Sequence, residues 1–210
     1  MDVWMHRVLM VAVLIVAVMI HEVAHGLAAL WCGDRTALER GRITLNPLRH
    51  IDPIGTILLP GLLALAGSSV VFGWAKPVPV DLSRTRNPRK ALWITAVAGP
   101  LSNLVQAILA AGALRGLGPL GLLPPWLAML LVITILINIV LLVFNLIPIP
   151  PLDGSRVLAA LLPQEWVSGY LSLGKFGFLL LFLLLQTKII GKVMEPALGL
   201  ILNWLVPGLA

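Results

Sequence analysis

The chain has 210 residues, of which 59 % are apolar and only 11 % are charged, and its mean hydropathy is +1.00. Soluble globular chains carry about 45–50 % apolar and about 25 % charged residues, so a water-soluble core could not bury this much apolar surface. The composition also excludes a disordered chain, and the single cysteine, Cys32, excludes an intramolecular disulfide framework. The sequence therefore indicates an integral membrane protein.

Six apolar runs follow one another along the chain. They cover residues 8–31, 54–72, 91–114, 126–149, 166–186 and 197–206. A helix needs about 20 apolar residues to cross a hydrocarbon core of about 30 Å, and the first, third and fourth runs exceed that length. We predict an all-α polytopic membrane protein with about five to six transmembrane helices. The loops are too short to hold a soluble domain, so residues 1–210 are predicted to form one transmembrane domain.

The second run, 54–72, is interrupted by residues that break helices. These are Gly55, Pro60, Gly61 and Gly67. The flanking segments 33–52 and 73–90 together hold nine of the fifteen Lys and Arg residues, and the positive-inside rule places both in the cytoplasm. Both can lie there only if the second run is a re-entrant hairpin; an ordinary broken crossing is the alternative. Membrane topology also explains the net charge of +6, so no nucleic-acid partner is predicted.

The first run contains the sequence HEVAH at residues 21–25. Residues i and i+4 share one face of a helix, so His21 and His25 can bind one metal ion, and Glu22 can reach a water molecule beside it. Ionisable side chains in a membrane helix are costly unless they coordinate a cation inside the bundle. The alternative is a pair of hydrogen-bonded core histidines with a structural glutamate. His21 lies about 21 Å along the helix from Arg7, which places the pair toward the cytoplasmic side.

A zinc site with two histidines needs a third protein ligand. Most other acidic residues lie in segments near the surface, whereas Asp153 directly follows the fourth run in the stretch NLIPIPPLDG, residues 145–154. The prolines favour an extended chain, which at membrane depth suits a buried or water-lined cavity, and Gly154 permits a tight turn. Asp153 is therefore predicted to be either the third ligand or the N-cap of a helix that begins at Ser155.

The combination of HEVAH with NLIPIPPLDG resembles the site-2 protease family of intramembrane zinc metalloproteases. The sequence GPLSN at residues 99–103 is similar to the same family, and FGWAKPVPV at residues 72–80 is similar to a compact bacterial and archaeal branch without a PDZ or CBS module. The resemblance covers core motifs within residues 10–160. The predicted C-terminal helices of residues 166–210 carry no matching motif.

The resemblance implies roles for individual residues. The implied metal ligands, which would hold one zinc ion per chain, are His21, His25 and Asp153. Glu22 matches the general base, and Asn145 matches a polar residue that helps to hold the substrate. Within GPLSN, Asn103 is interpreted as an interhelical hydrogen-bonding residue, and Gly99, like Gly26, as a residue that allows close helix packing.

The implied function is that of a zinc metalloendopeptidase that hydrolyses peptide bonds in or near transmembrane segments. Its expected substrate is a single-pass membrane protein or a signal-peptide remnant in the lipid bilayer, and its expected location is a prokaryotic cell membrane, with the site toward the cytoplasm. A substrate helix must unwind before attack, and we predict that the extended segment 73–80 holds it by strand addition. A membrane metal-binding or transport protein and a non-catalytic membrane scaffold remain alternatives. Glu22 favours the enzyme, because a scaffold has no chemical need for it.

Overall fold

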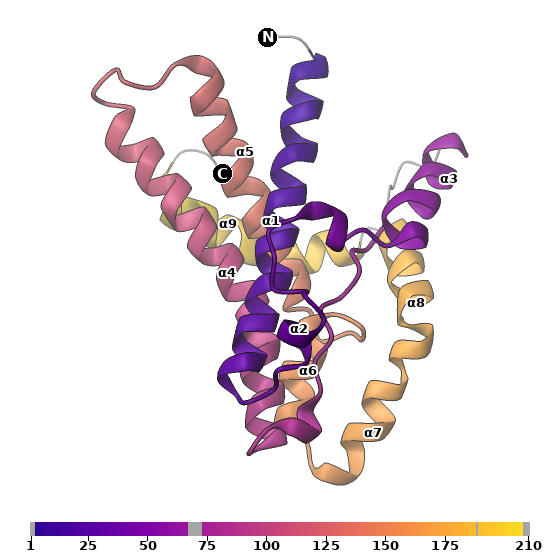
Figure 1. Cartoon of the computed structure of the whole chain (residues 1–210). Coiled ribbons are helices and arrows are strands. Elements are labelled where there is room, and N and C mark those ends of the chain that lie inside the picture. The colour runs from indigo at the N-terminus through magenta and orange to yellow at the C-terminus, as the bar shows by residue number, and fades with distance from the viewer. Residues whose placement is uncertain (1–2, 67–72, 188, 208–210) are drawn as a thin grey trace.

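The computed structural model describes residues 3–66, 73–187 and 189–207, and this part of the chain contains helices and no strand (Figure 1). The all-α prediction is confirmed. The longer helices are α1 (Val3–Trp31), α4 (Pro88–Leu117), α5 (Pro125–Asn145), α8 (Gly174–Gln186) and α9 (Ile189–Leu205). The shorter helices are α2 (Thr36–Glu39), α3 (Leu59–Leu65), α6 (Asp153–Leu161) and α7 (Gln164–Ser172). The remaining helical turns are η1 (Pro47–Arg49), η2 (Pro53–Leu58) and η3 (Leu82–Arg84).

Three of the described helices are long and apolar enough to span a membrane, namely α1, α4 and α5, and the pair α7–α8 makes a fourth if counted as one bent span. The predicted count of five to six is therefore not confirmed. The run over 166–186 contains a bend of 58° between α7 and α8, which a hydropathy pattern does not reveal. Helix α9 has only 17 residues and contains Lys192, Glu195 and Pro196.

Helices α1, α4 and α5 pack against one another in the centre of the molecule (Figure 1). Helix α4 begins where the Asn87 side chain accepts a hydrogen bond from the backbone N–H of Lys90, with Pro88 at the first helical position. The buried face of α4 is built largely from small residues. These include Ala91, Thr95, Ala96, Gly99, Ala107, Ala110 and Ala111. Small side chains let helix backbones approach closely, so α4 can hold α1 on one side and α5 on the other.

The C-terminal helices close the other side of α5. Helix α9 lies across α5, and Leu205 joins a core that includes Ile135 and Ile139 of α5 (Figure 1). Leu181 of α8 and Met194 of α9 form a second buried cluster with Leu152, which directly precedes α6. The single-domain interpretation of residues 1–210 stays a prediction.

Gly55 and Thr56, near the start of the interrupted apolar segment, lie beside Trp74, which follows that segment in the sequence. The backbone N–H of Trp74 donates to the carbonyl of Gly55 over 3.1 Å, and the Thr56 hydroxyl donates to the carbonyl of Trp74 over 2.9 Å. A hairpin requires the chain to come back to its starting point in this way. The predicted hairpin of 54–72, however, ends in residues 67–72, which lie outside the described part. Its depth in a membrane stays a prediction. Gly55 is needed here because a Cβ atom would lie 2.3 Å from the Trp74 indole.

A buried carboxylate ties the end of α1 to the segment before α4. Asp34 is fully buried and accepts hydrogen bonds from the backbone N–H of Thr36 (2.8 Å), from its hydroxyl, and from the backbone N–H of Asp81 (2.7 Å). Burial raises the pKa of the Asp34 carboxyl, but these hydrogen bonds outweigh that effect, so its pKa lies below the ordinary value. The sequence placed Asp34 near the surface and gave no sign of this connection.

Candidate metal centre

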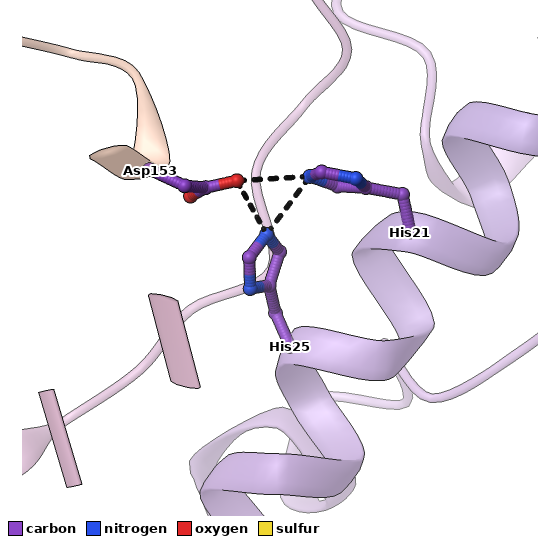
Figure 2. A group of neighbouring side chains, drawn as sticks. All are labelled: His21, His25 and Asp153. Carbon is purple, nitrogen blue, oxygen red and sulfur yellow. Dashed lines mark hydrogen bonds and ion pairs between the residues drawn. The ribbon is translucent and has the colours of Figure 1, made fainter. Parts of the chain in front are cut away.

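Two histidines of α1 meet an aspartate from the start of α6 (Figure 2). The Nε2 atoms of His21 and His25 lie 3.0 Å apart, and the Oδ2 atom of Asp153 lies 3.0 Å from the first and 3.2 Å from the second. All three residues are buried. Among the described residues, no second group of three His, Cys, Asp or Glu side chains converges in this way. The structure thus brings together the three residues that were considered as ligands.

Hydrogen bonds behind the imidazoles determine which ring nitrogens face the centre. Nδ1 of His21 donates to Oδ1 of Asn103 over 2.6 Å, and Nδ1 of His25 donates to the carbonyl of Thr95 over 2.6 Å. The Asn103 amide is oriented in turn, because its Nδ2 donates to Oδ1 of Asn138 over 2.8 Å. With both Nδ1 atoms protonated, both neutral rings present Nε2 lone pairs to a carboxylate oxygen. Three acceptors so close together repel one another, and a cation between them would remove that repulsion.

The spacing of these acceptors fits zinc. Tetrahedral zinc with bonds of about 2.0–2.1 Å holds its ligand atoms about 3.3 Å apart. The three observed separations, 3.0, 3.0 and 3.2 Å, are close to the edges of one face of such a tetrahedron. Two imidazoles and one carboxylate are also a common donor set for catalytic zinc, with a fourth position left open.

Asp153 is the first residue of α6, and Leu152 occupies the N-cap position without a side-chain cap. The alternative in which Asp153 caps a helix from Ser155 is therefore wrong. Gly154 is helical rather than part of a tight turn. Its role is close approach, because a Cβ atom would lie 2.2 Å from the carbonyl oxygen of Leu146.

Gly99 of α4 lies directly beside the imidazoles. A Cβ atom at this position would lie 2.4 Å from Nε2 of His25 and 2.5 Å from Nε2 of His21. The interpretation of Gly99 as a packing residue therefore misses its main effect, which is to leave space for the two rings. Gly26 allows the closest approach to non-helical segments rather than to another helix, since its Cβ would lie 3.2 Å from Ile43 and from Val78.

The remaining predicted residues lie on a cavity of about 450 Å³ that opens beside the centre. Glu22 lines this cavity, and its Oε2 accepts a hydrogen bond of 2.8 Å from the backbone N–H of Val78. Asn145, at the end of α5, also lines the cavity, and its Nδ2 donates to the carbonyl of Leu141. Aromatic walls come from Trp74, Phe144 and Phe178.

The roles of three residues at the site were not predicted from the sequence. Asn138 is fully buried and orients Asn103, Thr95 supplies the carbonyl for His25, and Val78 supplies the N–H for Glu22. Asn138 could have been noticed as an amide inside an otherwise apolar membrane helix. Thr95 and Val78 act through their backbone atoms, so their side chains carry no signal.

A bundle of long apolar helices that encloses an HExxH helix and a buried aspartate defines the class of membrane metalloproteases. Residues 124–184 match the family model "Peptidase family M50". The Bacillus subtilis protein "Putative zinc metalloprotease YwhC" is 38 % identical over 195 residues, which cover 90 % of this chain and 85 % of the relative. The chain belongs to peptidase family M50 and is a multi-pass membrane protein.

More distant relatives agree with this assignment. The protein "Putative zinc metalloprotease Rip2" of Mycolicibacterium smegmatis is 29 % identical over 185 residues, with 88 % of this chain and 69 % of the relative covered. Its namesake in Mycobacterium tuberculosis is 32 % identical over 161 residues, with coverage of 75 % and 59 %. No solved structure matches the chain.

Proposed function

We propose that this protein is an intramembrane zinc metalloprotease that hydrolyses peptide bonds in or near transmembrane segments of membrane-anchored substrates. The observation that carries the proposal is the triangle of two Nε2 atoms and one carboxylate oxygen, with sides of 3.0 to 3.2 Å. Membership of peptidase family M50 and the zinc metalloproteases among its relatives support the same activity.

In this proposal His21, His25 and Asp153 hold one zinc ion per chain. A bound zinc ion supplies Lewis-acid polarisation of the scissile carbonyl and of the attacking water. Hydrogen bonds behind the ligands keep the imidazoles in place, since the Asn103 side chain and the Thr95 backbone carbonyl accept the Nδ1 protons.

Glu22 is the proposed general base. Its carboxylate lies on the cavity beside the ligands, and the Val78 N–H fixes the position of one of its oxygens. A carboxylate held there accepts a proton from the attacking water and returns it to the leaving amine. This proton transfer accounts for a glutamate between the two histidines, which neither a metal carrier nor a scaffold requires.

The proposed substrate is a single-pass membrane protein or a signal-peptide remnant. Its carbonyls are hydrogen-bonded inside a helix, so a short stretch must unwind to reach the buried centre. The apolar and aromatic walls of the cavity suit such a stretch, and Asn145 is placed to hydrogen-bond with it. The clustered cations of 33–52 and 73–90 support a location in a prokaryotic cell membrane with the site toward the cytoplasm.

The test compares wild type with Glu22→Gln, purified in detergent and reconstituted in vesicles. Both proteins are expected to hold about one zinc ion per chain. The variant should cleave a panel of single-pass transmembrane segments about 10²- to 10⁴-fold more slowly, with products read by mass spectrometry. Wild type without zinc would contradict the enzyme and favour the scaffold. Equal cleavage by both would contradict the role of Glu22, and zinc binding without cleavage of any segment would favour the metal-binding or transport protein.

A further inference from the structure

A second cavity, of about 380 Å³, lies behind the segment that contacts Glu22. Its lining combines four cationic side chains with apolar ones. The cationic residues are Arg40, Arg42, Arg49 and Lys76, and the apolar ones are Leu48, Ile51, Pro77 and Pro79. We call this space the basic cavity. Among the residues that the structure describes, no carboxylate lines it.

The four cations of the basic cavity form no ion pair with any residue that the structure describes. Ion pairs in the described part of the chain involve His21, His25 and Arg84, and none involves these four residues. Arg42 is only 8 % exposed, and its Nε has no hydrogen-bond partner. Burial lowers the pKa of the Arg42 guanidinium, Glu22 opposes that shift and the neighbouring Arg49 adds to it. A buried guanidinium beside a second cation is a costly arrangement unless an anion completes it.

The extended segment 73–80 separates the basic cavity from the metal centre. Trp74, Val78 and Val80 line the cavity of the metal centre, Lys76 and Pro79 line the basic cavity, and Pro77 lines both. Two hydrogen bonds hold this segment from the basic side: an Arg42 terminal N–H donates to the carbonyl of Lys76 over 2.7 Å, and the Lys76 N–H donates to the carbonyl of His50 over 2.9 Å. An anion in the basic cavity would therefore lie across this segment from the proposed metal ligands, none of which lines the basic cavity.

The chemistry of the lining selects the anion. Guanidinium groups bind phosphate oxygens through paired, charge-assisted hydrogen bonds, and gathered Arg and Lys side chains near a membrane recognise phosphate headgroups. Leu48 lines the same cavity with 73 % of its surface exposed, so an apolar surface adjoins the charged one. We propose that the basic cavity binds a phosphate group, carried by an anionic phospholipid of the surrounding leaflet.

Membrane topology alone does not account for this cavity. The positive-inside rule requires cations in cytoplasmic segments, but it does not require them to surround one space or to bury a guanidinium with an unpaired Nε. The proposal concerns binding and does not depend on proteolysis.

The test is thermal unfolding of the full chain in detergent micelles at constant ionic strength. Three probes are titrated separately: dioleoylphosphatidylglycerol, dioleoylglycerol, which lacks the phosphate, and inorganic phosphate. A ligand that binds the folded state raises Tm in a concentration-dependent manner. We expect phosphatidylglycerol to raise Tm and dioleoylglycerol to leave it unchanged. A rise with inorganic phosphate alone would support the phosphate site and identify free phosphate as its source.

Two double variants with the same loss of charge make the test specific. Arg40→Gln with Arg49→Gln should raise the half-saturating concentration of phosphatidylglycerol about tenfold or more. Arg35→Gln with Arg86→Gln removes two exposed cations outside the cavity. This double variant should change the half-saturating concentration of phosphatidylglycerol less than about twofold. Equal weakening in both double variants, or no rise of Tm with either phosphate probe, would overturn the proposal.

Discussion

At the scale of single residues, Gly99 has the sharpest steric consequence. The Gly99→Ala variant places a methyl group where the Nε2 atoms of both imidazoles lie. We expect it to lower zinc content to less than about a tenth of wild type, because displaced ligands lose both distance and direction. Gly112→Ala on the same helix is the control, since nothing lies within 4 Å of its Cβ. Metal analysis of both purified variants is decisive, and full zinc occupancy in Gly99→Ala would contradict the described ring positions.

The amide pair behind His21 supports a second prediction. The Asn103→Leu variant removes the acceptor for Nδ1 of His21 and the donor to Oδ1 of Asn138, and leaves these two buried atoms without their partner. We expect zinc affinity to fall about 10- to 100-fold, as loss of hydrogen-bond partners behind metal ligands usually causes. Competition with a chelator measures this. Gln106→Leu, one turn further along α4 with a single weak bond of 3.3 Å to Ser102, serves as the control. Equal zinc affinity in Asn103→Leu and wild type would show that the Asn103 hydrogen bonds do not support metal binding by His21.

Residues whose positions follow from local spacing were the easiest to predict. His21 and His25 share a helix face by their spacing alone, so the pair was evident from the sequence. Asp153 required the resemblance, because the physics of its surroundings fitted an N-cap equally well. Asn138 could be noticed as an amide in an apolar helix, but its partner could not be predicted, nor could that of Val78. These partners lie 35 and 56 residues away, and only the folded chain brings them together.

At the scale of elements, the unbroken helices followed from hydropathy. The predicted run 91–114 lies within α4, and the run 126–149 corresponds to α5, which ends at Asn145 ahead of Pro148. The bend between α7 and α8 was missed, because apolar residues continue through it. In the described part of the interrupted segment 54–72, helices η2 and α3 have only 6 and 7 residues, and its glycines and prolines lower helix stability. Its path in the membrane stays a prediction.

Asp34 connects two elements and gives a prediction about pH. A carboxyl whose pKa is lower in the folded than in the unfolded state stabilises the fold above the unfolded value of about 3.9. That contribution is lost as pH falls through the folded pKa. We expect Asp34→Asn to unfold with about 1–3 kcal/mol less free energy at pH 7. The difference from wild type should shrink below about pH 4.

Unfolding of both proteins in detergent between pH 3 and 7 measures this difference. Glu39→Gln is the control, because Glu39 forms only an exposed ion pair of 2.8 Å with Arg84. A constant difference across the whole pH range would show that the Asp34 carboxylate does not stabilise the fold through its charge.

At the scale of the whole molecule, the metal centre joins distant parts of the chain. The proposed ligands His21 and Asp153 are 132 residues apart, so a bound ion closes a long loop and binds the folded state only. We expect 1,10-phenanthroline to lower the Tm of wild type by more than about 5 °C. The Asp153→Ala variant should unfold at a lower temperature from the start and respond little to the chelator. An equal response in both proteins would place the chelated metal elsewhere.

The hydrogen bond between Val78 and Glu22 has a spectroscopic consequence. Residues 77 and 79 are prolines, so the Val78 amide carries the only exchangeable backbone proton within the PVP sequence. The Val78 N–H donates a hydrogen bond to the carboxylate oxygen of Glu22. Its exchange with deuterium and its NMR shift therefore report directly on the proposed general base. Protonation of Glu22, or a peptide that draws the carboxylate away, will release the proton to solvent. The chain thus carries, beside its metal centre, an isolated natural probe of the state of one carboxylate.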